Sequence, residues 1–296
     1  MRVVQVLDEA TVPVTRLVEL PGRGVTRMWE CAGPPGAETL MLIHGVACTA
    51  ELNWGRVIAV LGRHFRVVAA DLRGHGDGIS SGSRFRLEDC ADDIAALAEV
   101  LSTSKLVAVG YSMGGLVAQL LYRRHPSLLS GLVLCSTTGT VLNSALEKLA
   151  ALALPATSMA LRWNPFLRLA TAELLGPTLL GPIDDPDIAS WARAQWRRTT
   201  LADAVAAVQA ASDFSSDGWI GQVDIPSAVV VTTKDSVVPV SCQRELAAMI
   251  PGASVYEVDA DHAVCITAPQ LLVTALLEAC WSVRPGHGRP LASAGA

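Results

Sequence analysis

Short runs of consecutive apolar residues are the feature of this sequence that most constrains its fold. A strand that is apolar at every position is typical of a parallel sheet that is buried on both faces. Four such runs lie in the first half of the chain, at residues 39–43, 66–71, 105–110 and 131–135. Two further strands are expected later, at residues 228–233 and 254–258.

Helical patterns separate these strands. Residues 89–101 place Ile94, Leu97 and Leu101 at helical spacing, with acidic residues on the other side. Alternation of strand and helix implies right-handed crossovers. The sequence therefore predicts an α/β fold class with a doubly wound, mostly parallel sheet flanked by helices. Further helices are expected at residues 116–124, 241–250 and 269–281.

The alternation of expected strands and helices is interrupted between residues 137 and 223. The segment is rich in Leu and Ala, contains five prolines and holds four of the seven tryptophans. That composition predicts several short helices and no strand, which favours a helical cap inserted into the core. The alternative is another packed helical layer. The expected organisation is a core of residues 1–136 and 224–284, a cap of 137–223 and a flexible tail of 285–296.

The hydrophobic content of 51% raises the question of a membrane protein. A spanning helix needs at least ~18 consecutive apolar residues. The stretch that most resembles a spanning helix, the uncharged run between Lys105 and Arg123, is shorter than this and contains three glycines. The next, at residues 149–161, is interrupted by Pro155. We therefore expect no stable membrane insertion, and we assign the apolar excess to a buried core, an apolar pocket or both.

Charge and cysteine usage exclude several other classes. The net charge of −5, without a run rich in Lys or Arg, argues against nucleic acid as a partner. The seven scattered cysteines form no Cys-x-x-Cys pair, and the six histidines show no metal spacing. We expect no metal and no cofactor. The N-terminus lacks the pattern of a signal peptide, so a cytoplasmic protein is expected, with homo-oligomerisation left open.

The strongest chemical signal is the segment Gly110-Tyr111-Ser112-Met113-Gly114-Gly115. It lies between an expected strand and an expected helix, the context in which G-x-S-x-G forms a sharp elbow. Small neighbours allow the strand and the helix to pack closely around a strained serine. The elbow would place the Ser112 hydroxyl at a helix N-terminus, where negative charge is favoured. The alternative is a glycine-rich turn without chemistry.

Together with this elbow, two earlier motifs make the sequence resemble the α/β-hydrolase superfamily over nearly its whole length. His44-Gly45 follows an early strand, and Asp71-Leu72-Arg73-Gly74-His75-Gly76 follows the next. The order matches the family's order. The resemblance implies a serine esterase-like member with a helical cap, whose acid and histidine follow that cap.

A serine nucleophile needs a base, and the base needs a carboxylate. The resemblance assigns the base to His262, just after the expected strand 254–258. It assigns the acid to Asp235, which follows a strand and precedes Pro239 by four residues. Asp259 and Asp261 are rivals because they lie beside the histidine in sequence.

The resemblance also implies an oxyanion hole made of two backbone amides, those of Val46 and Met113. It assigns a structural role to His44. Asp71 is interpreted as a structural carboxylate at a strand end, paired with Arg73.

Serine at the elbow excludes the dehalogenases and epoxide hydrolases of this fold, which use aspartate there. We expect a serine hydrolase that cleaves a carboxylic ester of a small to medium apolar acyl substrate through an acyl-enzyme at Ser112. The apolar cap favours an apolar acyl group. The alternatives are a C–C bond hydrolase, a lactonase, a thioesterase, a perhydrolase, or a non-catalytic ligand-binding member.

Overall fold

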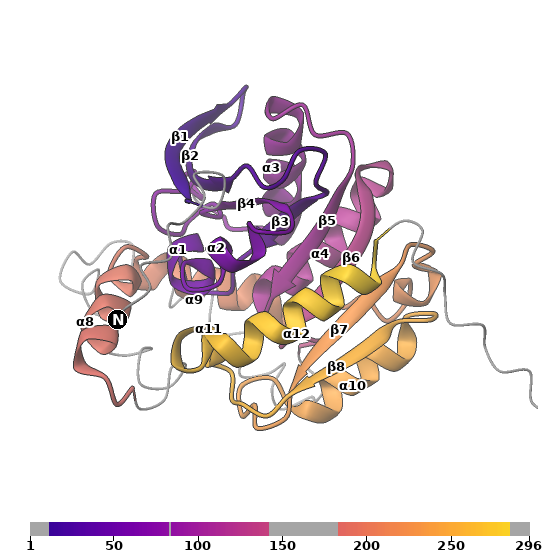
Figure 1. The fold of residues 1–296 in the computed structure, drawn as a ribbon. Helices are drawn as coiled ribbons and strands as arrows, with labels where there is room; N and C mark the ends of the chain where they lie inside the picture. Colours follow the sequence, from indigo (N-terminus) through magenta and orange to yellow (C-terminus); the bar gives the residue numbers. More distant parts are fainter. Residues whose placement is uncertain (1–11, 83, 142–182, 285–296) are drawn as a thin grey trace, which may run out of the picture.

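A computed structural model describes residues 12–82, 84–141 and 183–284 of the chain, which are arranged around one eight-stranded sheet (Figure 1). The strand order is β1-β2-β4-β3-β5-β6-β7-β8, and every pair from β4 to β8 is parallel. The predicted α/β class with a mostly parallel sheet is confirmed. The strands are β1 (Val14–Leu20), β2 (Gly24–Cys31), β3 (Thr39–Ile43), β4 (Arg66–Ala70), β5 (Leu106–Tyr111), β6 (Leu129–Cys135), β7 (Ser227–Thr232) and β8 (Ser254–Val258).

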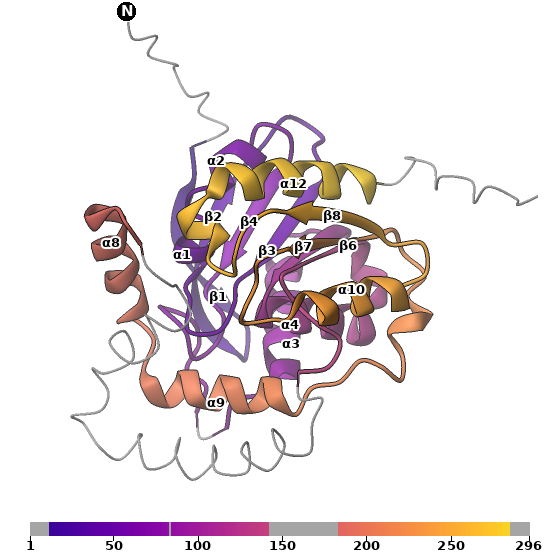
Figure 2. The same ribbon diagram turned by 90° about the horizontal axis from the view of Figure 1, so that it is seen from below.

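Helices cover both faces of this sheet (Figure 2). These helices are α1 (Ala50–Trp54), α2 (Ile58–Leu61), α3 (Leu87–Val100), α4 (Met113–Arg124), α10 (Val240–Met249) and α12 (Pro269–Ser282). Successive strand residues point to opposite faces. In β3, Met41 and Ile43 belong to the core cluster that includes residues of α3, α4 and α10, whereas Leu40 and Leu42 belong to the cluster that includes residues of α1, α2 and α12. Every residue of β3, β5 and β7 is buried, which explains their continuous apolar runs.

An antiparallel hairpin that the sequence analysis missed extends the sheet at its N-terminal edge. β1 and β2 pair from Val14–Glu30 to Leu20–Gly24, and β2 pairs with β4. Within β1 only Val18 and Leu20 are buried. An edge strand that is mostly exposed needs no continuous apolar run, so the criterion that found the inner strands does not detect it.

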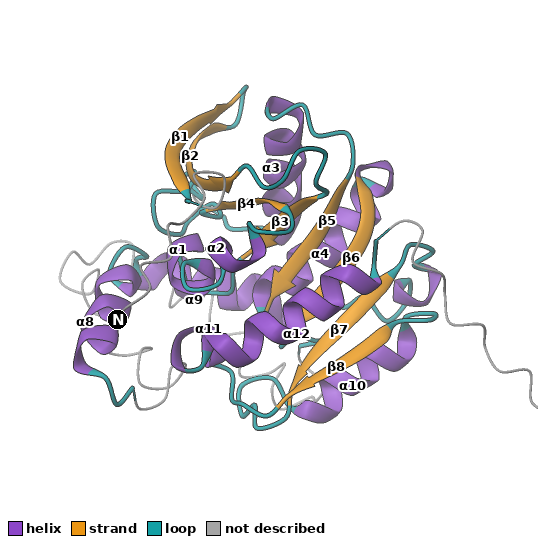
Figure 3. Cartoon of the chain, viewed as in Figure 1, coloured by secondary structure: helices purple, strands orange, loops and turns teal. Residues whose placement is uncertain are grey.

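Two longer helices of the predicted cap, α8 (Pro186–Trp196) and α9 (Leu201–Ser212), lie in the described part of the chain (Figure 3). The Asp185 side chain caps α8, and Pro186 occupies its first turn. The Thr200 side chain caps α9 by accepting a bond from the Asp203 amide. The part of the predicted cap at residues 142–182 lies outside the described residues, as does the predicted tail at 285–296.

The junction between α8 and α9 is fixed to the core by polar contacts. Arg198 donates to Asp77 in the loop after β4, and it also donates to Gln195 at 3.1 Å. Gln195 Oε1 in turn accepts a bond of 3.0 Å from the Thr49 hydroxyl, just before α1. The two helices are thus tied to the strand ends of the core. Within the described residues, no helix is long and apolar enough to span a membrane.

Candidate active site

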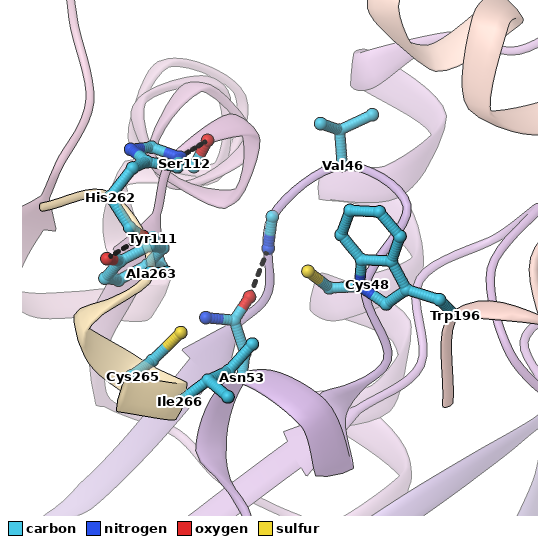
Figure 4. A pocket seen from close by; sticks show the side chains of 11 residues that line it. Val46, Cys48, Asn53, Tyr111, Ser112, Trp196, His262, Ala263, Cys265 and Ile266 are labelled. Carbon is cyan, nitrogen blue, oxygen red and sulfur yellow. Dashed lines mark hydrogen bonds between the residues drawn. The ribbon is translucent and has the colours of Figure 1, made fainter. Parts of the chain in front are cut away.

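Three strand ends bring the predicted nucleophile, base and acid together. Ser112 follows β5, Asp235 comes after β7, and His262 comes after β8. Parallel strands present their carboxyl ends at the same edge of a sheet. His262 Nε2 lies 3.0 Å from Ser112 Oγ (Figure 4), and His262 Nδ1 lies 2.7 Å from Asp235 Oδ2. The three side chains therefore form one continuous hydrogen-bonded chain.

The backbone of Ser112 adopts the strained conformation that an elbow requires. Its φ of 54° lies in a region that residues with a side chain rarely adopt. The Ser112 amide donates to the Cys135 carbonyl at 2.9 Å, and the Thr137 hydroxyl donates to the Ser112 carbonyl at 2.8 Å. Helix α4 begins at Met113, directly after the serine and three residues before the predicted start. The surrounding bonds thus hold the strained serine at the N-terminus of α4.

The glycines of the elbow are required by close packing. A Cβ atom at Gly114 would meet the Ile43 carbonyl oxygen, which is backbone and has little room to move. A Cβ atom at Gly110 would lie 2.6 Å from the Gly115 Cα, and one at Gly115 would lie 2.5 Å from the Thr137 side chain. The strand and the helix therefore approach each other only because these positions lack side chains.

Asp235 is buried and accepts hydrogen bonds at both oxygens. Oδ2 accepts from the Thr232 hydroxyl at 2.8 Å and from Gln243 Nε2 at 3.2 Å. Burial raises the pKa of Asp235, but the hydrogen bond and charge of His262 and its other donors outweigh this and hold the pKa below its ordinary value. The carboxylate is thus ionised when it faces the imidazole. The remaining donors are the amides of Val237 and Val238, at 2.8 and 2.9 Å from Oδ1.

The two rival acids have other partners. The Asp259 side chain is 76% exposed and pairs with Lys234 at 2.9 Å. Asp261 accepts a bond of 2.9 Å from the Ala263 amide and so shapes the turn after His262. Among these three acids, the structure places Asp235 alone against the imidazole.

Tyr111, the residue before the predicted nucleophile, also holds His262 in place. Its hydroxyl donates to the His262 carbonyl at 2.8 Å, and the two rings lie 5.6 Å apart. Burial raises the pKa of Tyr111 well above its ordinary value, so the phenol remains a neutral donor. The sequence analysis did not assign this role, because the middle position of G-x-S places no demand on residue type.

The loop after β3 carries one predicted oxyanion donor, Val46, and the first residue of α4, Met113, is the other. Within the described residues, the amides of Val46 and Met113 donate to no other protein group. Gly45 lies against Ser112, since a Cβ atom there would be 3.2 Å from Ser112 Cβ. The Gly45 amide donates to Asn53 Oδ1 at 2.8 Å, which fixes the loop. The use of the two amides as oxyanion donors remains a prediction.

His44 fixes the same loop from its other side. Its Nε2 accepts from the Leu72 amide at 2.8 Å, and its Nδ1 donates to the Gly45 carbonyl at 2.8 Å. This pattern requires the neutral imidazole. Burial lowers the pKa of His44 to about 4, in agreement with the neutral state.

The predicted pairing of Asp71 with Arg73 is wrong. Arg73 donates to both oxygens of Asp93, at 2.7 and 2.8 Å. The Asp71 carboxylate instead accepts from the amides of Ala50 and Asp77, at 2.8 and 2.9 Å. These bonds close the loop after β4 onto the start of α1, and the cation near Asp71 is Arg198, whose Nη2 lies 4.0 Å from Oδ2.

A pocket opens beside Ser112 and His262 (Figure 4). Its described lining contains no Lys, Arg, Asp or Glu, and Trp196 reaches it from α8. Burial raises the pKa of the Cys48 thiol to about 12 and that of Cys265 further, so both line the pocket as neutral groups. Five lining residues carry no sequence motif that would have identified them in advance: Cys48, Asn53, Trp196, Cys265 and Ile266.

Comparison with known proteins agrees with this architecture. A family model described as the alpha/beta hydrolase fold matches residues 38–269. A pimeloyl-(acyl-carrier protein) methyl ester esterase of Sodalis glossinidius is 35% identical over 109 residues, which cover 37% of this chain and 40% of that protein. The chain spans about two fifths of the length of the curated relatives that it matches at 35–40% identity.

Solved structures extend the likeness over the whole fold. A hydrolase from Pseudomonas aeruginosa is 24% identical, with a TM-score of 0.75 and coverage of 90% of this chain and 98% of that chain. The enol-lactonase from Burkholderia xenovorans is 22% identical, with a TM-score of 0.70 and coverage of 90% and 100%. At these identities the likeness concerns the fold.

Proposed function

This chain belongs to the α/β-hydrolase fold family, and we propose that it is a serine hydrolase that cleaves a carboxylic ester of a small to medium apolar acyl substrate. The observation that supports this most directly is the hydrogen-bonded chain from Ser112 Oγ through His262 to Asp235, with distances of 3.0 and 2.7 Å. Serine becomes a nucleophile only beside a base, and the imidazolium that forms needs a carboxylate.

In the proposed reaction, His262 Nε2 takes the hydroxyl proton while Ser112 Oγ attacks the acyl carbonyl. The amides of Val46 and Met113 stabilise the oxyanion. His262 then gives its proton to the leaving alkoxide, the C–O bond breaks, and an acyl-enzyme remains on Ser112. A water molecule, deprotonated by His262, attacks the acyl carbonyl and releases the carboxylic acid. Ser112 Oγ recovers a proton from His262.

The proposed apolar substrate rests on the pocket. Its described lining contains no Lys, Arg, Asp or Glu, and pockets of this kind take mostly apolar ligands with a few polar anchors. Trp196 of α8 supports the proposal that the segment 137–223 is a cap that contributes to substrate binding. The relative from Sodalis glossinidius is named as an ester hydrolase. Because one of the similar solved structures is an enol-lactonase, a lactone is the second candidate substrate class.

Covalent labelling tests the proposal. We expect a fluorophosphonate probe to label the wild-type protein and Ser112→Ala to abolish both labelling and the turnover of p-nitrophenyl butyrate. Ser102→Ala is a matched control, because Ser102 also has a positive φ (50°) but is exposed beyond the end of α3. Unchanged turnover in Ser112→Ala would remove the nucleophile assignment. An unlabelled wild-type protein would favour a ligand-binding member, and faster turnover of a lactone or a vinylogous diketone would change the substrate class.

A further inference from the structure

Asn53, in α1, carries a buried polar group that the proposed mechanism does not use. The residue is 1% exposed, and its Oδ1 accepts the Gly45 amide at 2.8 Å. Its Nδ2 is buried and makes no hydrogen bond of ordinary geometry among the described residues. The side chains of Asn53 and Cys265 share a weak hydrogen bond, but a thiol is a weak acceptor and leaves the amide poorly satisfied. Because buried donors in folded proteins are nearly always satisfied, this amide calls for an acceptor from a ligand.

We propose that Asn53 Nδ2 binds a neutral oxygen atom on the acyl part of the substrate. The enzyme would then prefer acyl groups that carry a second carbonyl beyond the scissile one. This inference rests on the proposed ester hydrolysis, and it adds a determinant of specificity to it.

The position of Asn53 places the donor beside the reaction. Asn53 lines the same pocket as Ser112 and His262 (Figure 4). Gly45 lies between the amide and the nucleophile, since a Cβ atom there would be 3.2 Å from Ser112 Cβ and 3.5 Å from Asn53 Oδ1. The Gly45 bond also fixes which end of the amide is available, because Oδ1 is occupied and Nδ2 is left as the donor.

The charge of the surroundings selects a neutral acceptor over a carboxylate. The described lining holds no Lys or Arg, and the ionised Asp235 lies directly behind His262. An anion buried without a cationic partner is strongly disfavoured. A ketone, ester or amide carbonyl accepts the same hydrogen bond without that penalty.

Matched ester pairs test the inference. We compare kcat/KM for p-nitrophenyl 5-oxohexanoate with hexanoate, and for 4-oxopentanoate with pentanoate, in wild-type protein and in Asn53→Asp. Asn53→Asp keeps an oxygen for the Gly45 amide but replaces the donor with an acceptor. We expect wild-type protein to favour the oxo ester of at least one pair by about threefold to tenfold, the size of one net hydrogen bond. In Asn53→Asp that ratio should fall to one or below.

Cys265→Ala is the control for this comparison, because it alters the neighbour of the amide and keeps the donor, so the preference should persist. Equal kcat/KM values within both pairs in wild-type protein would overturn the inference. The inference would also be overturned if the preference for the oxo ester persisted in Asn53→Asp, or if it were lost only in Cys265→Ala. Each comparison is a ratio between two substrates of one protein, so a general loss of activity does not move it.

A binding measurement separates this inference from the proposed function. The Ser112→Ala protein keeps Asn53, and calorimetry compares its affinity for ethyl 5-oxohexanoate and ethyl hexanoate. Tighter binding of the oxo ester by about threefold to tenfold supports the donor even if no ester is turned over or Asn53→Asp fails to fold. Equal affinities would overturn it, whether or not the protein hydrolyses esters.

Discussion

At the scale of single residues, the charge of Asp235 is the most direct target for a test. Asp235→Asn keeps the shape and an acceptor for the amides of Val237 and Val238, but it removes the negative charge beside His262. We expect kcat for p-nitrophenyl butyrate to fall by about 10³- to 10⁴-fold, since the imidazolium loses its counter-ion and its tautomer is no longer fixed.

The control for this prediction is Asp259→Asn, which removes an exposed carboxylate paired with Lys234. It should leave kcat within about twofold, because a surface ion pair contributes little. A larger loss in Asp259→Asn than in Asp235→Asn would reverse the assignment of the acid.

Some of the residues at the site could be predicted from the sequence, and others could not. Ser112, Asp235 and His262 could be proposed from the chain because each stands at a set place relative to a strand end. Tyr111 and Asn53 could not, because their roles depend on which groups of other elements lie within 3 Å of them. Asp71 shows the same limit, since its donors come from amides that only the folded loop brings near.

At the scale of elements, the close packing of α4 against the end of β3 predicts that Gly114 tolerates no side chain. A Cβ atom there would meet the Ile43 carbonyl of the neighbouring strand. We expect Gly114→Ala to lower the free energy of unfolding by about 1–3 kcal/mol, the usual effect of overpacking. Gly218→Ala is the matched control, because nothing lies within 4 Å of its added Cβ atom. Urea unfolding of both variants measures the difference, and equal stabilities would contradict the close approach.

The polar contacts of Arg198, which anchor α8 and α9 to the core, are predicted to contribute to the free energy of unfolding. Arg198→Met removes one of two arginine partners of Asp77, which keeps its ion pair with Arg27 at 2.6 Å. The junction is partly buried, with the Arg198 side chain 25% exposed. We expect the free energy of unfolding to fall by about 1–3 kcal/mol, as for a lost bond to a charged group.

Arg244→Met removes a pair with Glu257 in which both side chains are about half exposed, at 57% and 49%. It should lower the free energy of unfolding by less than about 1 kcal/mol. Thermal or urea unfolding compares the two variants, and an equal loss would show that the Arg198 contacts contribute no more than a surface pair.

Among the elements, the inner strands and the helices α3, α4, α10 and α12 were predictable, with strand ends that shift by at most two residues, whereas the short helices α1 and α2 were not predicted. The burial of the inner strands on both faces leaves an unbroken apolar signal. The hairpin β1–β2 could not be predicted in this way, because an exposed edge strand can be mostly polar. The early start of α4 was also missed, since glycines at 114 and 115 favour no helix until packing against β3 and Thr137 forces them into one.

At the scale of the whole molecule, two buried histidines predict how stability depends on pH. Burial lowers the pKa of His44 to about 4, and burial together with the neighbouring His44 lowers that of His75 to about 4. In the unfolded chain a histidine has a pKa of about 6.5. The unfolded state therefore binds more protons between these values, and the free energy of unfolding should fall as the pH falls from about 6.5 to about 4.

Each histidine should contribute a loss of up to about 3 kcal/mol across this window. Urea unfolding at several pH values between 7.5 and 4.5 measures it. His75→Gln removes one of the two groups and should flatten the curve by about half. The lowered pKa of Asp235 adds its own loss only below about 4, the ordinary pKa of a carboxyl group, so it lies outside this window. A free energy that stays constant from pH 6.5 to 4.5 would contradict the buried neutral state of both rings.

The distribution of the site over strand ends has a consequence for the nascent protein. Ser112 and His262 are 150 residues apart, and β6, β7 and β8 must be in place before the imidazole reaches the hydroxyl. A growing chain on the ribosome therefore carries its nucleophile long before it carries the base. In the proposed enzyme the serine stays chemically inert during synthesis, and hydrolytic activity appears only when the last parallel strand has joined the sheet.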